Sequence, residues 1–208
     1  MSVSSPGRLY GGATAEQRIA ERRRKLVEAG VTLFGSHESG SVRVKDVAAE
    51  AGLTERYFYE SFSDLGALFD VVLERVLAEI EAQVDAALVD APDDTPARIS
   101  IALRTVVESL ATDANKTQIL LVEGFGKGGR VDPQRHELND RWMADFLRWS
   151  GPDRQPFRGG AVEARMKALA LSGAATELMI SWSEGLLDVS TDELADFLVG
   201  LYWRANLP

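Results

Sequence analysis

The chain has 208 residues, of which 45% are hydrophobic and 26% are charged, a balance that supports a packed core and excludes a disordered chain. It contains no cysteine, which excludes disulfide bonds, thiolate catalysis and cysteine-ligated metal sites. It has no run of about 18 apolar residues, and its first residues, MSVSSPGRLYGG, lack the apolar centre of a signal peptide. We therefore expect no membrane association and a cytoplasmic location.

The net charge of −9 is unevenly distributed along the chain. Residues 1–60 carry nine Lys and Arg against eight Asp and Glu, whereas the remaining residues carry 14 against 24. The first part also contains a basic run from Arg22 to Lys25. Attraction to phosphate depends on local charge, so the acidic total does not exclude nucleic-acid binding by this part of the chain.

The first helix is expected to follow a flexible arm. Residues 1–14 are rich in Ser and Gly, which is typical of a mobile terminus. Thr14 can cap a helix, with Gln17 completing a capping box, and the helix is predicted to reach about Gly35. The polar segment SHESGS, residues 36–41, is predicted to be a loop.

Two short helical patterns follow in VRVKDVAAEAGLTERYFYESF, residues 42–62. The apolar residues of the first pattern recur at i, i+3, i+4 and i+7, namely Val44, Val47, Ala48 and Ala51. Gly52 suits the left-handed conformation that ends a helix, and Thr54 is a candidate N-cap for the next one. Helices joined so tightly cross steeply, as in a helix-turn-helix that inserts its second helix into the major groove of DNA.

Helical spacing continues to the C-terminus. Ser63 is predicted to cap a long helix that reaches about Leu88, and Thr95 is predicted to cap another, with Pro96 at its first position. Further helices are expected at 118–124, 133–149 and 161–184, and a last one begins at Ser190 or Thr191. No β alternation of useful length is present, so we predict an all-α protein. The expected domains are a flexible arm (1–14), a three-helix DNA-binding domain (15–63) and a C-terminal helical domain for ligand binding and dimerisation (64–208).

The helix order, and above all AAEAGLTERYFYESF followed by a long helix, resembles the TetR family of bacterial transcriptional regulators, in particular its actinobacterial-type members. The resemblance is strongest over residues 18–75. Residues on family positions are Val47, Ala48, Ala51, Gly52, Leu53, Tyr59 and Phe62. It implies a homodimer whose N-terminal domain binds a DNA operator and whose C-terminal domain binds a small molecule that releases the operator.

The resemblance also implies which residues contact DNA. They are Val44, Lys45, Thr54, Glu55, Arg56, Tyr57, Tyr59 and Ser61. A bidentate contact to guanine suits Arg56, an acceptor from cytosine suits Glu55, and phosphate contacts suit Lys45, Thr54 and Tyr59. Phe58 and Phe62 are expected in the core, while Tyr57 is open to either packing or DNA contact.

One position departs from the family pattern. The family usually has a lysine that faces phosphate at the start of the long helix, where this chain has Leu65. Arg43 or the basic run would offset this loss, or the chain binds DNA more weakly.

The resemblance suggests a dimer interface and a pocket in the C-terminal domain. Helices 161–184 and 191–205 resemble the pair that forms a four-helix bundle between subunits, although their small residues would also suit packing within one subunit. The aromatic and sulfur-containing residues expected at a pocket are Phe69, Phe125, Trp142, Met143, Phe146, Trp149, Met179 and Trp182. Its expected polar groups are Glu123, Asn139 or His136, and its ligand a hydrophobic, uncharged or cationic molecule. Equally, the aromatic residues would suit a packed core.

Catalysis is not expected. His37 and His136 are the only histidines and neither has a partner at metal-ligand spacing, while GFGKGG lacks the spacing of a phosphate-binding loop. We therefore expect no metal and no cofactor. The alternatives are a helical small-molecule-binding protein or an enzyme that uses Glu123 and His136 without operator binding, and a regulator that has lost its response to a ligand.

Overall fold

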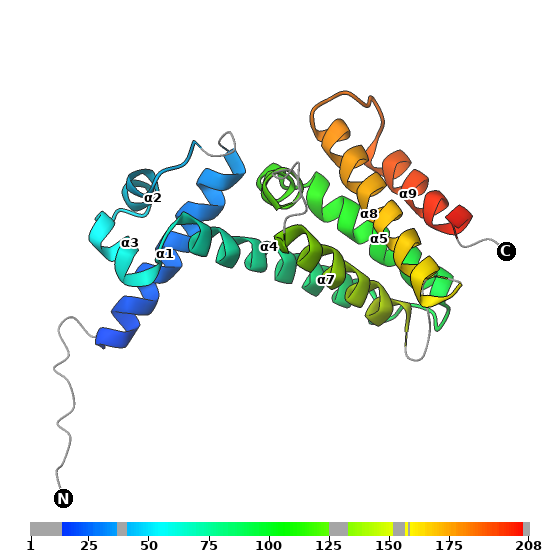
Figure 1. Ribbon diagram of the computed structural model, residues 1–208, viewed down its shortest axis with the longest axis horizontal. Coiled ribbons are helices and arrows are strands. Elements are labelled where there is room, and N and C mark those ends of the chain that lie inside the picture. The colour runs from blue at the N-terminus through cyan, green and yellow to red at the C-terminus, as the bar shows by residue number, and fades with distance from the viewer. Residues whose placement is uncertain (1–13, 37–40, 125–132, 152–156, 158, 206–208) are drawn as a thin grey trace, which may run out of the picture. The chain divides into compact units, whose positions relative to one another are not determined.

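The computed structural model describes residues 14–36, 41–124, 133–151, 157 and 159–205 (Figure 1). Helices and the turns that join them account for these residues, which contain no β-strand, so the predicted all-α class is confirmed. No helix in the described ranges is long and apolar enough to cross a membrane. The chain divides into a first compact unit, residues 1–74, and a second, residues 75–208. The division falls inside helix α4 (Leu65–Ala87).

The first unit contains α1 (Ala15–Ser36), α2 (Val44–Glu50), α3 (Glu55–Ser61) and the beginning of α4. The predicted capping box starts α1, because the Thr14 amide donates to Gln17 Oε1 at 2.7 Å and the Gln17 amide donates to Thr14 Oγ1 at 3.1 Å. Both bonds satisfy donors that the helix itself cannot satisfy. The hydrogen bonds that start α1 therefore lie within the four consecutive residues from Thr14 to Gln17.

The turn between α2 and α3 is built around Gly52, whose φ is +64°. The Leu53 amide donates to the Ala48 carbonyl at 2.8 Å, and the Gly52 amide donates to the Ala49 carbonyl at 3.0 Å. This is the glycine-ended helix terminus that the sequence predicts. Thr54 occupies the N-cap position of α3, but its hydroxyl makes no capping bond and only its carbonyl accepts from the helix.

The core of the first unit joins α4 to the three helices before it. Its buried residues include Leu26, Leu33, Phe34, Val47, Phe58, Phe62, Leu68 and Val72. Gly30 allows α1 to approach α4 closely, since a Cβ at this position would lie 2.9 Å from Val72 Cγ2. Phe69 packs edge-to-face against Phe34, with ring centroids 5.3 Å apart. These contacts hold α4 against α1.

The N-cap of α4 is Asp64, so the prediction of Ser63 is wrong. The Ala67 amide donates to Asp64 Oδ1 at 2.9 Å, and the Ser63 hydroxyl donates to the same carboxyl group at 3.1 Å. Both bonds, the backbone one most, lower the pKa of Asp64. A carboxylate also suits the partial positive charge of a helix N-terminus better than a hydroxyl does.

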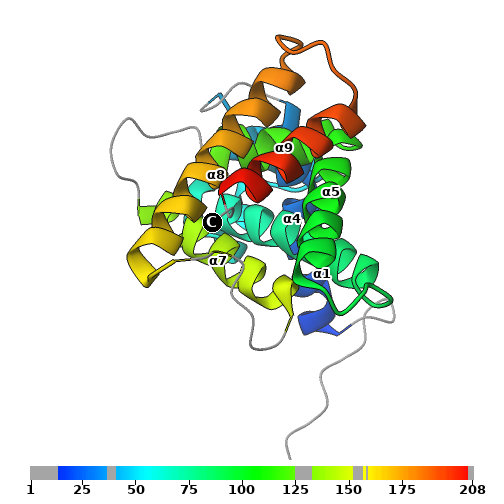
Figure 2. The same cartoon turned by 90° about the vertical axis from the view of Figure 1, so that its right-hand side faces the viewer.

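The second unit comprises the rest of α4, α5 (Thr95–Ala111), α6 (Ala114–Thr117), the π-helix η1 (Gln118–Gly124), α7 (Pro133–Ser150), α8 (Ala161–Ser183) and α9 (Thr191–Ala205). Figure 2 shows α5 against α9, with α8 beside α7 and α9. The α5 cap is Asp94, not Thr95. Thr95 instead donates its hydroxyl to the Ser150 carbonyl. Ser190 and Glu193 form the capping box of α9, as one of the two predicted starts requires.

Candidate DNA interface and ligand cavity

The outer face of α3 is polar and its inner face is aromatic. Phe58 is fully buried, whereas the side chain of Arg56 is 84% exposed and Tyr59 is 60% exposed. Arg56 donates to Glu60 one turn later at 3.1 Å, an exposed pair of little energetic weight. Glu55 is also exposed, at the first position of the helix. The second helix of the helix-turn-helix therefore presents Glu55, Arg56 and Tyr59 to solvent.

Tyr57 and Ser61, the two other candidates on α3, are both engaged by α1. The guanidinium of Arg22 lies 4.4 Å from the ring centroid of Tyr57, which is half-buried. The carbonyl of Ser61 accepts from Arg23 Nη1 at 2.7 Å. These contacts hold α3 against α1, and they favour packing as the first role of Tyr57.

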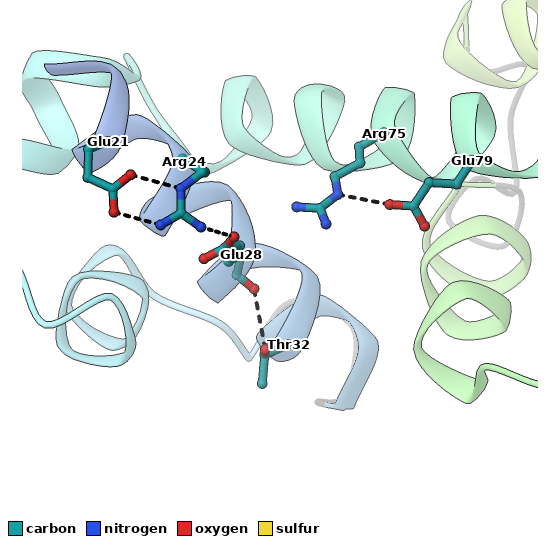
Figure 3. Close-up of polar contacts among 6 residues, drawn as sticks. All are labelled: Glu21, Arg24, Glu28, Thr32, Arg75 and Glu79. Carbon is teal, nitrogen blue, oxygen red and sulfur yellow. Dashed lines mark hydrogen bonds and ion pairs between the residues drawn. The ribbon is translucent and has the colours of Figure 1, made fainter. Parts of the chain in front are cut away.

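The arginines of the basic run do not form a free positive surface. Arg24 donates to Glu21 at 2.6 and 2.9 Å and also to Glu28 (Figure 3). These contacts lower the pKa of Glu21 and raise that of Arg24. Arg22 and Arg23 lie over Tyr57 and Phe62. Sequence spacing showed that these cations are clustered, but it did not show that their partners lie in the same unit.

The start of α2 supplies exposed cations. Arg43 occupies the N-cap position, where its amide donates to Asp46 Oδ2 at 3.1 Å, and its side chain is exposed. Lys45 is exposed as well, while Val44 is half-buried. At the start of α4, by contrast, half-buried Leu65 follows the ionised cap Asp64, so no cation stands at this position.

A cavity of about 560 Å³ lies within the second unit, between α5, η1, α7, α8 and α9. Five of the expected pocket residues line it, namely Trp142, Met143, Phe146, Trp149 and Met179. Two do not. Phe69 packs on Phe34 in the first unit, and Trp182 donates its indole N–H to the Val189 carbonyl at the turn before α9. Phe125 and the side chains of Glu123, His136 and Asn139 lie outside the described residues.

An aromatic cluster forms one wall of this cavity. The ring of Phe146 lies 6.0 Å from Trp149, 5.9 Å from Phe157 and 6.2 Å from Tyr202, measured between centroids. Burial raises the pKa of Tyr202 to about 12, so its phenol is neutral at physiological pH. The buried Nε1–H of Trp149 has no acceptor within the described ranges. The cluster therefore combines rings that pack on one another with two neutral polar groups, the phenol of Tyr202 and the indole N–H of Trp149.

Small side chains of α8 and aliphatic side chains of α5 face this cluster. The small ones are Ala161, Ala164, Ala168 and Ala175, and the aliphatic ones are Leu103, Val106, Val107 and Leu110. Because alanine fills so little volume, the space between the helices stays open. From the sequence, the alanines of α8 were expected to pack against other helices and were not expected at a pocket. Their recurrence at helical spacing opposite aromatic residues was the available signal.

No protein-family model matches the chain, and no curated protein matches it either. Solved structures do share its fold. A TetR-like transcriptional regulator from Rhodococcus sp. RHA1 is 16% identical, with a TM-score of 0.65 over 88% of this chain and 94% of that one. A TetR-family regulator from Streptomyces coelicolor is 17% identical, with a TM-score of 0.67 over 89% and 80%.

A third similar structure is the fatty acid degradation regulator FadR from Bacillus halodurans, at 14% identity and a TM-score of 0.67 over 87% of this chain and 94% of that one. The chain thus has the fold of a helix-turn-helix regulator with a C-terminal helical domain. More specifically, it has the fold of TetR-like transcriptional regulators, as the sequence resemblance implies.

Proposed function

We propose that the protein is a sequence-specific, DNA-binding transcriptional regulator. The observation that carries this proposal is the two-sided construction of α3, which is anchored by Phe58 and Phe62 and exposes Arg56 and Tyr59. A helix held so firmly can enter a major groove without rearrangement. The shared fold of TetR-like regulators supports the same conclusion. Such a protein would act in the cytoplasm.

The proposed contacts fall into two kinds. Arg56 and Glu55 read base edges, and Lys45, Arg43, Thr54 and Tyr59 fix the position of the protein on the phosphates. Val44, Tyr57 and Ser61 lie at the margin of this surface and are only partly exposed. Arg43 and Lys45 at the start of α2 supply the positive charge that Leu65 does not.

We propose a homodimer formed through α8 and α9. Exposed large apolar side chains lie on these helices and the turn between them, namely Met166, Leu186 and Phe197, together with Val162 and Leu169, which also line the cavity. A second copy would cover this surface by a symmetric interface. Two copies would present two α3 helices to a palindromic operator, and each half-site would be read by one copy.

We further propose that the protein is a repressor released from its operator by a small hydrophobic ligand. The cavity volume of about 560 Å³ lies within the range of about 300–1,000 Å³ that is usual for ligand pockets. The proposed ligand contacts are Trp142, Met143, Phe146 and Met179, all on α7 and α8. No observation favours the enzymatic alternative.

Selection of bound sequences from random double-stranded DNA tests the proposal. We expect enrichment of a palindrome whose half-sites lie about one helical turn or more apart. Repeating the binding step with a cell extract and with its small-molecule fraction tests release. If no sequence is enriched, the proposal of a DNA-binding regulator is contradicted. If no fraction releases the protein from DNA, the proposal that a ligand releases it is contradicted.

A further inference from the structure

The described lining of the cavity contains no uncompensated charge. Its two ionised residues, Asp140 and Arg165, form an ion pair at 3.1 Å, and their side chains are 63% and 60% exposed. They therefore lie at the solvent edge and neutralise each other. The other described lining residues are apolar or carry neutral polar groups.

A charged ligand would lose its hydration in this cavity without meeting a counter-charge among the described lining residues. Aromatic faces offset only part of this cost for a cation. Here the rings of Phe146, Phe157 and Tyr202 also pack on one another, with Trp149 beside them, and so do not form an open aromatic cage. The described part of the lining thus disfavours anions and cations alike.

Besides the buried indole N–H of Trp149, a second neutral polar group on the cavity wall is unused. Thr176, on α8, is half-buried and lines the cavity, and its hydroxyl makes no hydrogen bond within the described part of the chain. Other helical threonines donate to a carbonyl one turn earlier, as Thr32 does to Glu28 and Thr105 does to Ile101. The Thr176 hydroxyl is therefore a donor without an acceptor beside an apolar space.

We propose that the cavity takes an uncharged, mainly apolar aromatic molecule that carries a neutral hydrogen-bond acceptor, such as a ketone or ester, and that Thr176 donates to this acceptor. The inference rests on the proposed ligand-binding role and narrows its ligand class. The aromatic wall of α7 and α9 would contact the rings of the ligand, and the alanines of α8 give them room.

Four matched probes test the ligand class by calorimetric titration of the full chain without DNA. They are benzophenone, diphenylmethane, para-benzoylbenzoate and the para-(trimethylammonio)methyl derivative of benzophenone. We expect benzophenone to bind more tightly than diphenylmethane and at least about tenfold more tightly than either ion. Binding of an ion as tightly as the ketone, or binding of none of the four, would overturn the inference.

Two substitutions at one position test the role of Thr176. Thr176→Val replaces the hydroxyl by a methyl group, and we expect it to lower benzophenone affinity about threefold to tenfold while leaving diphenylmethane affinity unchanged. Thr176→Ser keeps the hydroxyl and should keep the ketone preference. An equal loss of both probes in Thr176→Val would show a shape effect and refute the hydrogen bond.

The location and the regulatory role are tested separately. Benzophenone cross-links to its neighbours on illumination, and peptide mapping should place the label on α5, η1, α7, α8 or α9. A label confined to other elements refutes the site. Probe-induced release of a selected operator is then measured by mobility shift. If the probes bind in the expected order but none releases the operator, the ligand class is supported and ligand-released repression is contradicted. Release by an ionic probe that binds as tightly as benzophenone contradicts the ligand class alone.

Discussion

Arg23 on α1 donates from Nη1 to the carbonyl oxygen of Ser61, the last residue of α3, at 2.7 Å. The same guanidinium lies 4.2 Å from the ring centroid of Phe62. Carbonyl groups at the end of a helix lack an intrahelical partner and carry partial negative charge, so a cation stabilises them. The two residues are 38 positions apart, and their contact fixes the end of α3 on α1.

Removing this contact should destabilise the first unit. We expect Arg23→Ala to lower the free energy of unfolding by about 1–3 kcal/mol, because it removes a charge-assisted hydrogen bond and a cation–π contact together. Urea unfolding followed by circular dichroism measures the change. Lys25→Ala, two positions away and exposed, is the control, and an equal loss there would refute the role of Arg23.

DNA affinity should separate base-reading from phosphate-contacting residues. We expect Arg56→Ala to cost about 1–3 kcal/mol on the selected operator and to relax preference at one base pair, and Lys45→Ala to weaken all sequences and reduce the salt slope by about 1. Fluorescence anisotropy with operator variants at several salt concentrations measures both.

Arg75 provides the matched control for Arg56. It is exposed and pairs with Glu79 at 3.0 Å, in the same i, i+4 arrangement as Arg56 with Glu60 at 3.1 Å. Arg75→Ala should leave operator binding unchanged. If it weakens binding as much as Arg56→Ala, the effect belongs to overall charge and the assignment of Arg56 fails.

The proposed dimer should dissociate when charge is placed on its apolar surface. Met166 on α8 is 59% exposed and Phe197 on α9 is 50% exposed. We expect Met166→Glu and Phe197→Glu to give a monomer at micromolar concentration, because the two copies would each bury an unpaired carboxylate. Sedimentation velocity measures the mass. Val89→Glu, at a 77% exposed position after α4, should remain dimeric.

Gly30 should not tolerate a larger side chain. We expect Gly30→Ala to destabilise the protein by about 1–3 kcal/mol, because its Cβ would lie 2.9 Å from Val72 Cγ2 in a packed core. Val72→Ala removes that methyl group, so the double variant should cost less than the two single changes together. Urea unfolding of all four proteins gives the coupling, and strict additivity would contradict this close approach.

The cap of α4 should make stability depend on acid pH. Hydrogen bonds to Ala67 and Ser63 lower the pKa of Asp64 in the folded state, so its stabilising effect is present above about pH 4 and is lost as pH falls through the folded value. We expect Asp64→Ala to lower the urea midpoint at neutral pH and to have less effect near about pH 2. Asp64→Asn keeps an acceptor and should cost less than Asp64→Ala. A loss that does not vary with pH would contradict the role of the charge.

Features that depend on neighbouring residues could be predicted from the sequence. The Gly52 turn and the Thr14–Gln17 capping box are examples, because their hydrogen bonds close within a few positions. The choice of cap between adjacent residues was less predictable, as Asp64 and Asp94 show. In both cases the aspartate beside the predicted hydroxyl residue makes the bond.

Contacts between distant side chains could not be predicted in this way. The sequence shows three adjacent arginines, yet only the fold brings Arg22 onto Tyr57 and Arg23 onto Ser61. The cavity is a similar case, since five of the aromatic or methionine residues expected at a pocket line it, but the alanines of α8 were not expected there. Whether an alanine closes or opens a space depends on the residue opposite, which spacing along one helix does not reveal.

Helix α8 has two occupied sides, since Ala168 and Thr176 line the cavity while Met166 faces solvent on the proposed dimer surface. The same helix would thus contact both the ligand and the second copy. By thermodynamic reciprocity, a ligand that binds the dimer more tightly than the monomer must strengthen self-association by the same factor. The apparent ligand affinity would then differ between dilute and concentrated protein solutions, because the fraction of dimer depends on protein concentration.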